Sequence, residues 1–202
     1  MTAAEAAAFE RCIADGGVAL FPADTVYGLA ADPESAAAVE RLYALKGRPS
    51  ARPAAVMFFA LDTALATLSD LGPRTLAALG RLLPGPVTAV VSNPLRRYPL
   101  ACGPEPERIG VRVPELRGAL APLRGVTRPV LQSSANPSGG SDARRLEEID
   151  PALLAGVDLA LDGGELPGTP STVVDLTAYE AAGDYRVLRS GAFPQADLRD
   201  RL

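Results

Sequence analysis

Short apolar runs alternate along the chain with stretches in which apolar residues recur at helical spacing. The first pattern is typical of buried strands and the second of helices packed on a core. Strands are predicted at residues 18–21, 54–59, 87–91, 108–113, 129–132, 157–161, 172–176 and 185–189. Helices are predicted after a capping box at Thr2 and Glu5, and at residues 32–45, 61–69, 73–83, 115–123, 143–149 and 151–155. This alternation predicts the α/β class, with a mixed sheet of about eight strands.

A polar turn follows the first predicted strand. Asp24, Thr25 and Tyr27 crowd into this turn, which Gly28 closes. Polar groups therefore gather at the end of the strand, where they could hold a small polar ligand.

The helix after this turn is predicted to end in two cations. Asp32 is the expected cap of its first turn, and Gly47 is the expected left-handed residue at its end. Lys46 and Arg48 would then project beside the polar turn and could hold a polyanion. The ordinary alternative is that both are solvated cations that suit the negative end of the helix dipole.

Length and charge bound the class of protein. A chain of 202 residues can bury one substantial core, which predicts a single domain over residues 1–202. The net charge of −4 gives no overall basic footprint for nucleic acid, although a local basic groove is compatible with it. No apolar run is long enough to cross a bilayer, and the N-terminus lacks a signal-peptide pattern. We therefore expect a cytoplasmic protein that does not contact a membrane.

The chain contains no histidine. This excludes a Ser-His-Asp triad, a Cys-His pair and imidazole-ligated zinc. Cys12 and Cys102 form no C-x-x-C motif, and we interpret them as small core or loop residues. Catalysis would depend on lysine, arginine, carboxylates, hydroxyls, backbone amides or a metal that the substrate carries.

Two further loops have the composition of a binding site. The segment SSANPSGG at 133–140 follows a predicted strand and offers hydroxyls, an amide and glycines, which suit phosphate oxygens. The segment GTPST at 168–172 leads into another strand. Either could instead be an ordinary turn. The proline-rich segment 92–107 has no period, and we expect a flexible loop or lid there.

Arg112 and Arg189 lie within predicted apolar strands. A buried arginine is costly unless it meets an anion, so each requires an internal carboxylate or a bound ligand. The sequence leaves both options open.

Seven motifs occur in one order along the chain: PADTVYGLA, KGRP, PGPVT, IGVRVP, SSANPSG, PSTVVD and VLRSG. This series resembles the YrdC-like family of TsaC-type threonylcarbamoyl-AMP synthases over about residues 16–191. The resemblance implies a twisted open mixed α/β sheet with a concave cationic ligand cleft. It also implies formation of threonylcarbamoyl-AMP and pyrophosphate from L-threonine, bicarbonate and ATP. The product would serve N6-threonylcarbamoyladenosine at position 37 of tRNA, through downstream proteins that transfer the threonylcarbamoyl group.

The resemblance also implies residue roles. Lys46 and Arg48 match the phosphate-binding and catalytic pair. The implied ATP-binding residues are Lys46, Arg48, Arg52, Ser134, Asn136 and Arg189. The implied threonine-binding residues are Thr25, Tyr27, Arg112 and Ser171. No dedicated metal ligand is implied, and Mg²⁺ would arrive bound to ATP.

Four residues depart from the family pattern. Ala23 stands where threonine is usual, and Arg108 where threonine is common. Glu115 stands where histidine often follows RVP within a residue or two, and Met57 stands where some relatives have histidine. They affect substrate detail more than reaction class. Two alternatives stay open: a YrdC-like paralogue with another carbamoyl-adenylate activity, and a module that binds tRNA or double-stranded RNA. Binding of RNA through its backbone would weaken steeply with salt.

Overall fold

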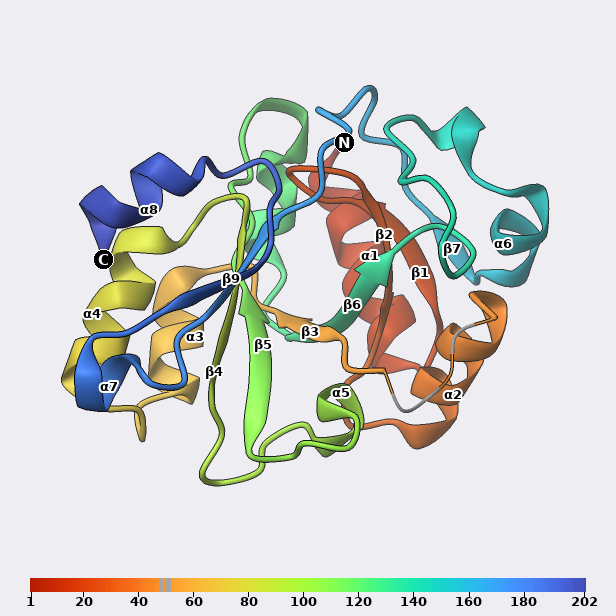
Figure 1. Cartoon of the computed structure of the whole chain (residues 1–202). Helices are drawn as coiled ribbons and strands as arrows, with labels where there is room; N and C mark the ends of the chain where they lie inside the picture. The colour runs from red at the N-terminus through yellow and green to blue at the C-terminus, as the bar shows by residue number, and fades with distance from the viewer. Residues whose placement is uncertain (48, 50–51) are drawn as a thin grey trace.

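The computed structural model describes residues 1–47, 49 and 52–202, and its strands form one nine-stranded sheet. The strand order is β7-β1-β2-β6-β3-β5-β4-β8-β9 (Figure 1). The strands are β1 (Ala19–Pro22), β2 (Tyr27–Ala31), β3 (Ala55–Met57), β4 (Val87–Ser92), β5 (Arg108–Arg112), β6 (Val130–Ser134), β7 (Leu159–Ala160), β8 (Thr172–Asp175) and β9 (Arg186–Arg189). The pairs β1–β7, β3–β5 and β4–β8 are parallel and the other five are antiparallel. The predicted mixed α/β sheet is confirmed.

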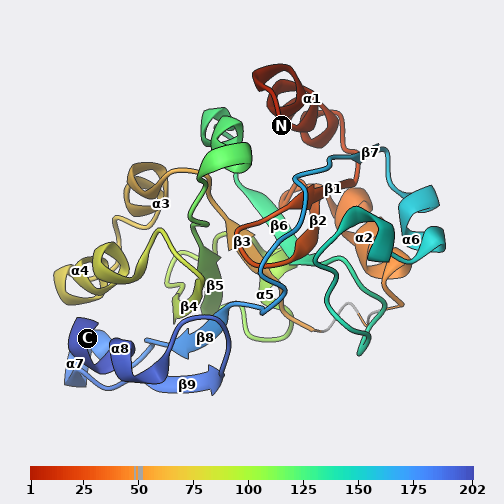
Figure 2. The same ribbon diagram turned by 90° about the horizontal axis from the view of Figure 1, so that it is seen from above.

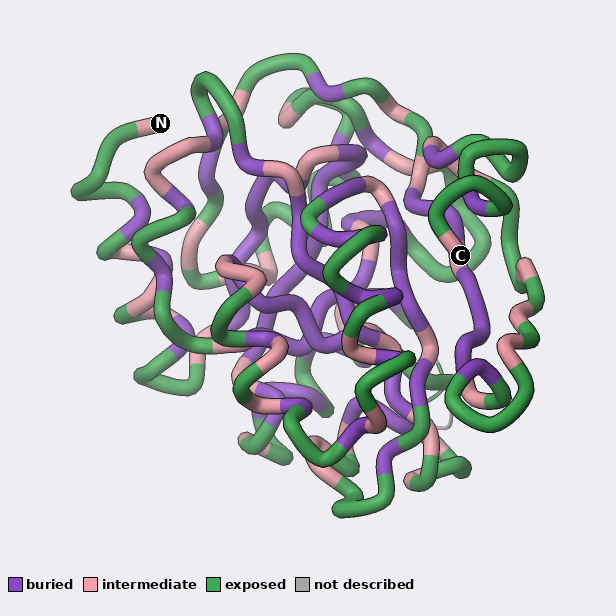
Figure 3. The backbone as a smooth tube through the Cα atoms, turned by 90° about the vertical axis from the view of Figure 1, so that its left-hand side faces the viewer, coloured by how far each residue is buried: buried purple, intermediate pink, exposed green. Residues whose placement is uncertain are grey.

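Helices surround this sheet. They are α1 (Ala3–Ala14), α2 (Ala36–Leu45), α3 (Leu61–Thr67), α4 (Pro73–Leu82), α5 (Pro99–Cys102), α6 (Pro151–Gly156), α7 (Tyr179–Ala182) and α8 (Gln195–Arg201), with 3₁₀ turns at Gly118–Gly125 and Leu146–Glu148. Figure 2 shows α1, α3 and α4 on one side of the sheet, with α7 and α8 beside β8 and β9. The buried part of the backbone runs through the middle of the molecule, where the strands lie (Figure 3).

Helix α1 shows how the sequence sets one of these contacts. Thr2 accepts a hydrogen bond from the backbone of Glu5, whose carboxylate accepts one from the backbone of Thr2, so the predicted capping box is present. Phe9 is then fully buried, with its ring centroid 5.1 Å from that of Phe21 in β1 and 5.7 Å from that of Phe59. These rings attach the first helix to the sheet.

Strand β2 contradicts the prediction that a turn closed at Gly28 leads directly into a helix. All five residues of β2 are buried, so the strand shows no alternation of apolar and polar residues. A Cβ atom on Gly28 would lie 2.8 Å from the Gln132 amide nitrogen, so glycine allows β2 to approach β6 closely.

Other boundaries also differ from the prediction. Helix α2 begins after Ser35, which accepts a hydrogen bond from the backbone of Ala38, whereas Asp32 accepts one from Glu34 in the preceding turn. The predicted helices at 115–123 and 143–149 are reduced to the two 3₁₀ turns. Helices α5, α7 and α8 were not predicted.

Within the described residues, no helix combines the length and the apolar character that a membrane span requires.

Candidate active site

One face of the central strands forms the floor of a cavity of about 440 Å³. Arg108, Gly110 and Arg112 alternate along this face of β5, whereas Ile109 and Val111 point to the buried core on the other face. The polar side chains in the cavity lining are Thr88, Glu105, Arg108, Arg112, Gln132, Ser133, Ser134, Asp142, Ser171 and Arg189. The cavity therefore combines residues from β3, β4, β5, β6, β8, β9 and the segments that precede or follow them.

Arg112 occupies one end of this floor and is only 3% exposed. Its guanidinium donates to the carboxylate of Asp24 and to the hydroxyl of Thr25, both in the turn before β2. The second oxygen of Asp24 accepts a hydrogen bond of 2.9 Å from the backbone of Glu115. The Nε atom of Arg112 is buried without a hydrogen-bond partner. The buried arginine thus has an internal carboxylate, and it also faces the cavity.

Ser171 connects the start of β8 to both neighbouring strands. Its hydroxyl lies 2.8 Å from the hydroxyl of Thr88 in β4, and its carbonyl accepts a 2.8 Å hydrogen bond from Arg189 in β9. Although much of Arg189 is exposed, its guanidinium is partly enclosed. This desolvation lowers the pKa of Arg189, Asp142 opposes the shift, and the charge of Arg112 adds to it. Unlike Arg112, Arg189 has no carboxylate ion pair among the described residues.

Lys46 is the last residue before the predicted left-handed glycine, and it is 3% exposed. Gly47 has a φ of 56°, as predicted. The Lys46 ammonium donates to the carbonyls of Ser134 and Asn136 and, at 3.0 Å, to the side-chain oxygen of Asn136. The interpretation of Lys46 as a solvated helix-end cation is therefore wrong, because its charge holds the loop after β6.

Asn136 completes this network. Its side-chain oxygen accepts from Ser134 at 2.7 Å, and its amide nitrogen donates to the carbonyl of Gly140 and, at 3.3 Å, to Asp142. The amide group is thereby oriented from both ends. Ser134 and Asp142 border the cavity, so the network fixes their positions on its wall.

Several predicted residues are absent from the cavity lining or cannot be placed. Thr25, Lys46 and Asn136 are connected to the lining through hydrogen bonds to Arg112 and Ser134. The hydroxyl of Tyr27 donates to Asp162 and to the carbonyl of Gly164, both at 2.9 Å, and Tyr27 is absent from the cavity lining. Burial of the phenol raises the pKa of Tyr27 to about 12. Arg52 is exposed and also lies outside the lining, and Arg48 lies outside the described residues.

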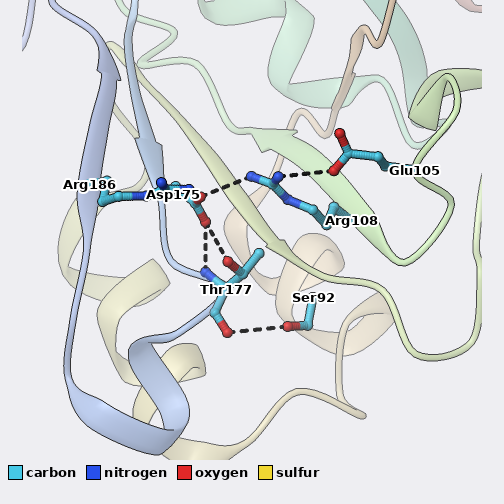
Figure 4. Close-up of polar contacts among 6 residues, drawn as sticks. All are labelled: Ser92, Glu105, Arg108, Asp175, Thr177 and Arg186. Atoms are coloured by element: carbon cyan, nitrogen blue, oxygen red, sulfur yellow. Dashed lines mark hydrogen bonds and ion pairs between the residues drawn. The ribbon is translucent and has the colours of Figure 1, made fainter.

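Several polar residues of the cavity were not singled out as site residues from the sequence. Thr88 lies in the PGPVT motif, which could have indicated it, whereas Gln132 and Asp142 carry no comparable signal. Arg108 was identified only as a departure from the family pattern. Figure 4 shows that it joins Glu105, at 3.0 Å, and the buried Asp175 of β8, at 2.9 Å.

The charges of the cavity are partly balanced. Arg108, Arg112 and Arg189 line it together with Glu105 and Asp142, while Asp24 and Asp175 lie against two of the arginines. The cationic character of the cleft therefore stays a prediction.

The family model for Sua5, YciO and YrdC proteins, described as telomere recombination, matches residues 11–191. The chain belongs to the Sua5/YciO/YrdC family. The resemblance inferred from the seven ordered motifs is confirmed by this match.

Curated members of the Sua5/YciO/YrdC family extend this finding. The chain is 28% identical over 187 residues to threonylcarbamoyl-AMP synthase of Pyrococcus abyssi, which covers 92% of this chain and 54% of that protein. It is 32% identical over 185 residues to the enzyme of that name in Mus musculus, with 87% and 63% covered. The Thiobacillus denitrificans synthase is 33% identical over 164 residues, with 80% and 85% covered. The chain thus spans only 54% and 63% of the Pyrococcus and mouse proteins.

Solved structures of the family share the fold. Pyrococcus abyssi Sua5 complexed with L-threonine superposes with a TM-score of 0.84 at 25% identity, over 100% of this chain and 58% of that one. Escherichia coli YciO superposes with a TM-score of 0.79 at 27% identity, over 96% and 92% of the two chains. The predicted YrdC-like sheet is confirmed by these superpositions.

Proposed function

We propose that this chain is an L-threonylcarbamoyladenylate synthase, which forms threonylcarbamoyl-AMP and pyrophosphate from L-threonine, bicarbonate and ATP. The observation that supports this most is that Arg112, Ser134, Ser171 and Arg189, which come from four separate motifs, line one cavity. Relatives named threonylcarbamoyl-AMP synthase and a family structure with L-threonine bound point to the same reaction.

We assign the Arg112 end of the cavity to threonine. The guanidinium would bind the amino-acid carboxylate, which explains why it faces the cavity although Asp24 already balances its charge. Thr25, bonded to Arg112, and Ser171 would contact the polar groups of threonine. For Tyr27 we propose a supporting role, because its hydroxyl is bonded to the segment around Asp162.

We assign the loop after β6 and the end of α2 to the phosphates of ATP. Lys46 holds Ser134 and Asn136 in place, and Arg189 carries a guanidinium that no described carboxylate pairs. Arg48 and Arg52 would add charge from the same segment. Mg²⁺ would enter on the phosphates, since the described residues contain no group of three or more potential metal ligands.

The reaction requires no protein nucleophile. The threonine amine attacks bicarbonate to give a carbamate and water, and a carbamate oxygen then attacks the α-phosphorus of ATP as pyrophosphate leaves. The protein would contribute by positioning both substrates and by stabilising phosphate charge. A chain without histidine can perform this chemistry.

Pyrophosphate release tests the proposal. With ATP and bicarbonate present, L-threonine should stimulate release strongly, and serine and glycine should stimulate it weakly. Pyrophosphate release that does not depend on threonine, in a chain that binds ATP, would contradict the proposal.

That outcome would favour a paralogue with a different carbamoyl adenylate as product. Two observations would fit such a paralogue. Met57 and Ala23, which depart from the family pattern, are both fully buried near the site strands. The chain also matches YciO over nearly the whole length of that protein. Transfer of the threonylcarbamoyl group to tRNA by downstream proteins belongs to the proposal, as does any direct contact with tRNA or double-stranded RNA.

A further inference from the structure

Glu105 and Arg108 form a polar pair at the opposite end of β5 from Arg112. Both line the cavity, and the assignments above give neither of them a role. They lie two strands away from β8, where Asp175 accepts from the Arg108 guanidinium across β4 (Figure 4).

Asp175 holds Arg108 firmly. This carboxylate is 3% exposed and also accepts hydrogen bonds from Arg186 at 2.8 Å and from the backbone and hydroxyl of Thr177. Arg108 in turn donates to one oxygen of Glu105, Oε2, at 3.0 Å. The guanidinium is therefore fixed by two carboxylates, while its side chain stays 33% exposed.

Hydrogen-bonding capacity remains on both partners. The terminal nitrogens of an arginine carry four N–H groups, and the two carboxylates use one on each nitrogen. Among the described residues, Oε1 of Glu105 accepts no hydrogen bond, and the Glu105 side chain is 61% exposed. The cavity thus presents a fixed donor beside a free acceptor.

The walls around this pair are apolar. Val90 and Val173 form the floor, and Cys102 and Pro104 border it. Leu188 of β9 also lines the cavity, although it is 49% exposed and is one of only three exposed large apolar side chains in the described residues. An apolar slot with a donor and an acceptor at one edge suits a flat heterocycle.

We infer that the Glu105–Arg108 pair recognises the adenine base of the nucleotide and discriminates against guanine. The inference rests on the proposed function, which supplies ATP as the occupant of the cavity. Arg108 would donate to a ring nitrogen, and Oε1 of Glu105 would accept from the exocyclic amino group.

The pattern of donors and acceptors favours adenine. Its N6 amino group lies beside a ring nitrogen acceptor, whereas the corresponding edge of guanine presents two acceptors, N7 and O6. Guanine would therefore place an acceptor against Oε1 of Glu105, and two acceptors cannot form a hydrogen bond. On the Watson–Crick edge, adenine presents N6 as a donor beside N1 as an acceptor, whereas guanine presents O6 as an acceptor beside N1–H as a donor. Because the phosphates and the ribose would set the direction of the base, guanine would place O6 against Oε1 of Glu105 and N1–H against the Arg108 guanidinium.

Calorimetric titration of the full chain with ATP and with GTP, without threonine, tests this inference. The wild-type chain should bind ATP about tenfold more tightly than GTP. In Glu105→Gln the amide oxygen would accept from Arg108, so the NH₂ group would face the base and the preference should fall to parity or reverse. Glu107→Gln is the matched control, because Glu107 is exposed, its side chain bonds only Arg96 among the described residues, and it lies outside the cavity.

Two further measurements separate the explanations. Inorganic tripolyphosphate, which has no base, should bind wild-type and Glu105→Gln chains equally, whereas an effect of Glu105 on phosphate charge would change its affinity. Arg108→Thr leaves Arg186 and Thr177 bonded to Asp175, and it should also lose the preference for ATP.

Equal binding of ATP and GTP by the wild-type chain, or an unchanged ratio in Glu105→Gln, would overturn the inference. If the chain prefers ATP through Glu105 but releases no threonine-dependent pyrophosphate, the inference about the adenine base is supported and the proposed synthase activity is contradicted. If threonine-dependent pyrophosphate release is equal with ATP and GTP, the inference about the adenine base is contradicted and the proposed synthase activity is not.

Discussion

Lys46 is the only lysine of the chain, and every other basic side chain is an arginine. Its position explains the exception. A compact ammonium can donate to three acceptors that converge from different directions, as the Ser134 and Asn136 oxygens do here. A planar guanidinium is larger and directs its donors into one plane.

We therefore expect Lys46→Arg to behave as a severe substitution. Overpacking of the buried site should lower the free energy of unfolding by about 1–3 kcal/mol. Threonine-dependent pyrophosphate release should fall as well, because the loop after β6 shifts. Urea titration measures the first effect, and Arg41→Lys, on the exposed side of α2, should stay within about 0.5 kcal/mol of wild type.

Arg112 gives a second prediction at this scale. Arg112→Ala would leave Asp24 buried without its cation, and we expect a loss of about 3–5 kcal/mol in the free energy of unfolding. Adding Asp24→Asn should recover part of that loss, since the uncompensated charge disappears. Strictly additive losses in the double variant would show that the two side chains are not coupled.

The sequence indicated that Arg112 requires an anion, and the structure supplies Asp24 from 88 positions away. It did not indicate that Lys46 is buried. The acceptors of Lys46 are mostly backbone carbonyls of a distant loop, and every residue type has a carbonyl, so no residue pattern reports them.

At the scale of elements, the strands with strong apolar runs were predictable and β2 was not. The sequence YGLAA has small residues, one glycine and no period, because the strand is buried on both faces between β1 and β6. The start of α2 was predicted at Asp32 instead of Ser35 for a different reason. Asp32 and Ser35 are both good caps, and only the turn around Asp32 decides between them.

Two glycines predict opposite outcomes for one substitution. A Cβ atom at Gly47 or at Gly80 would meet no atom of the described residues within 4 Å. Gly47 has a positive φ, so Gly47→Ala should destabilise the chain by about 1–2 kcal/mol. Gly80 lies inside α4, where alanine should stabilise by about 0.5–1 kcal/mol. Thermal unfolding of both variants checks the signs, and a shared sign would contradict the backbone argument.

At the scale of the whole molecule, the absence of histidine shapes the dependence of stability on pH. No side chain with an ordinary pKa titrates between about pH 5 and 8. Below that range, several carboxylates have lowered pKa values. For Asp175 burial acts to raise the pKa, but hydrogen bonds from Thr177 and Arg186 and the charge of Arg108 lower it overall. Hydrogen bonds from Arg41 and Val18 lower the pKa of Asp158.

A lowered pKa means that these groups stabilise the fold when ionised and cease to do so as the pH falls through their folded pKa values. The free energy of unfolding should therefore stay level from about pH 8 to 5.5 and decline below about pH 4.5. Urea titrations across this range measure it. A marked slope between pH 6 and 7.5 would show that a group outside this set controls stability.

The cavity floor combines β3, β4, β5, β6 and β8 with Arg189 at the end of β9. Residues that are far apart in the sequence therefore form this floor. During synthesis, the segment up to β5 leaves the ribosome before β6, and β8 and β9 follow later still. A nascent chain can therefore form α1 and the β1–β2 hairpin early, whereas the cavity floor is complete only after β9 has emerged. Premature termination anywhere before β9 would release a protein with an open floor.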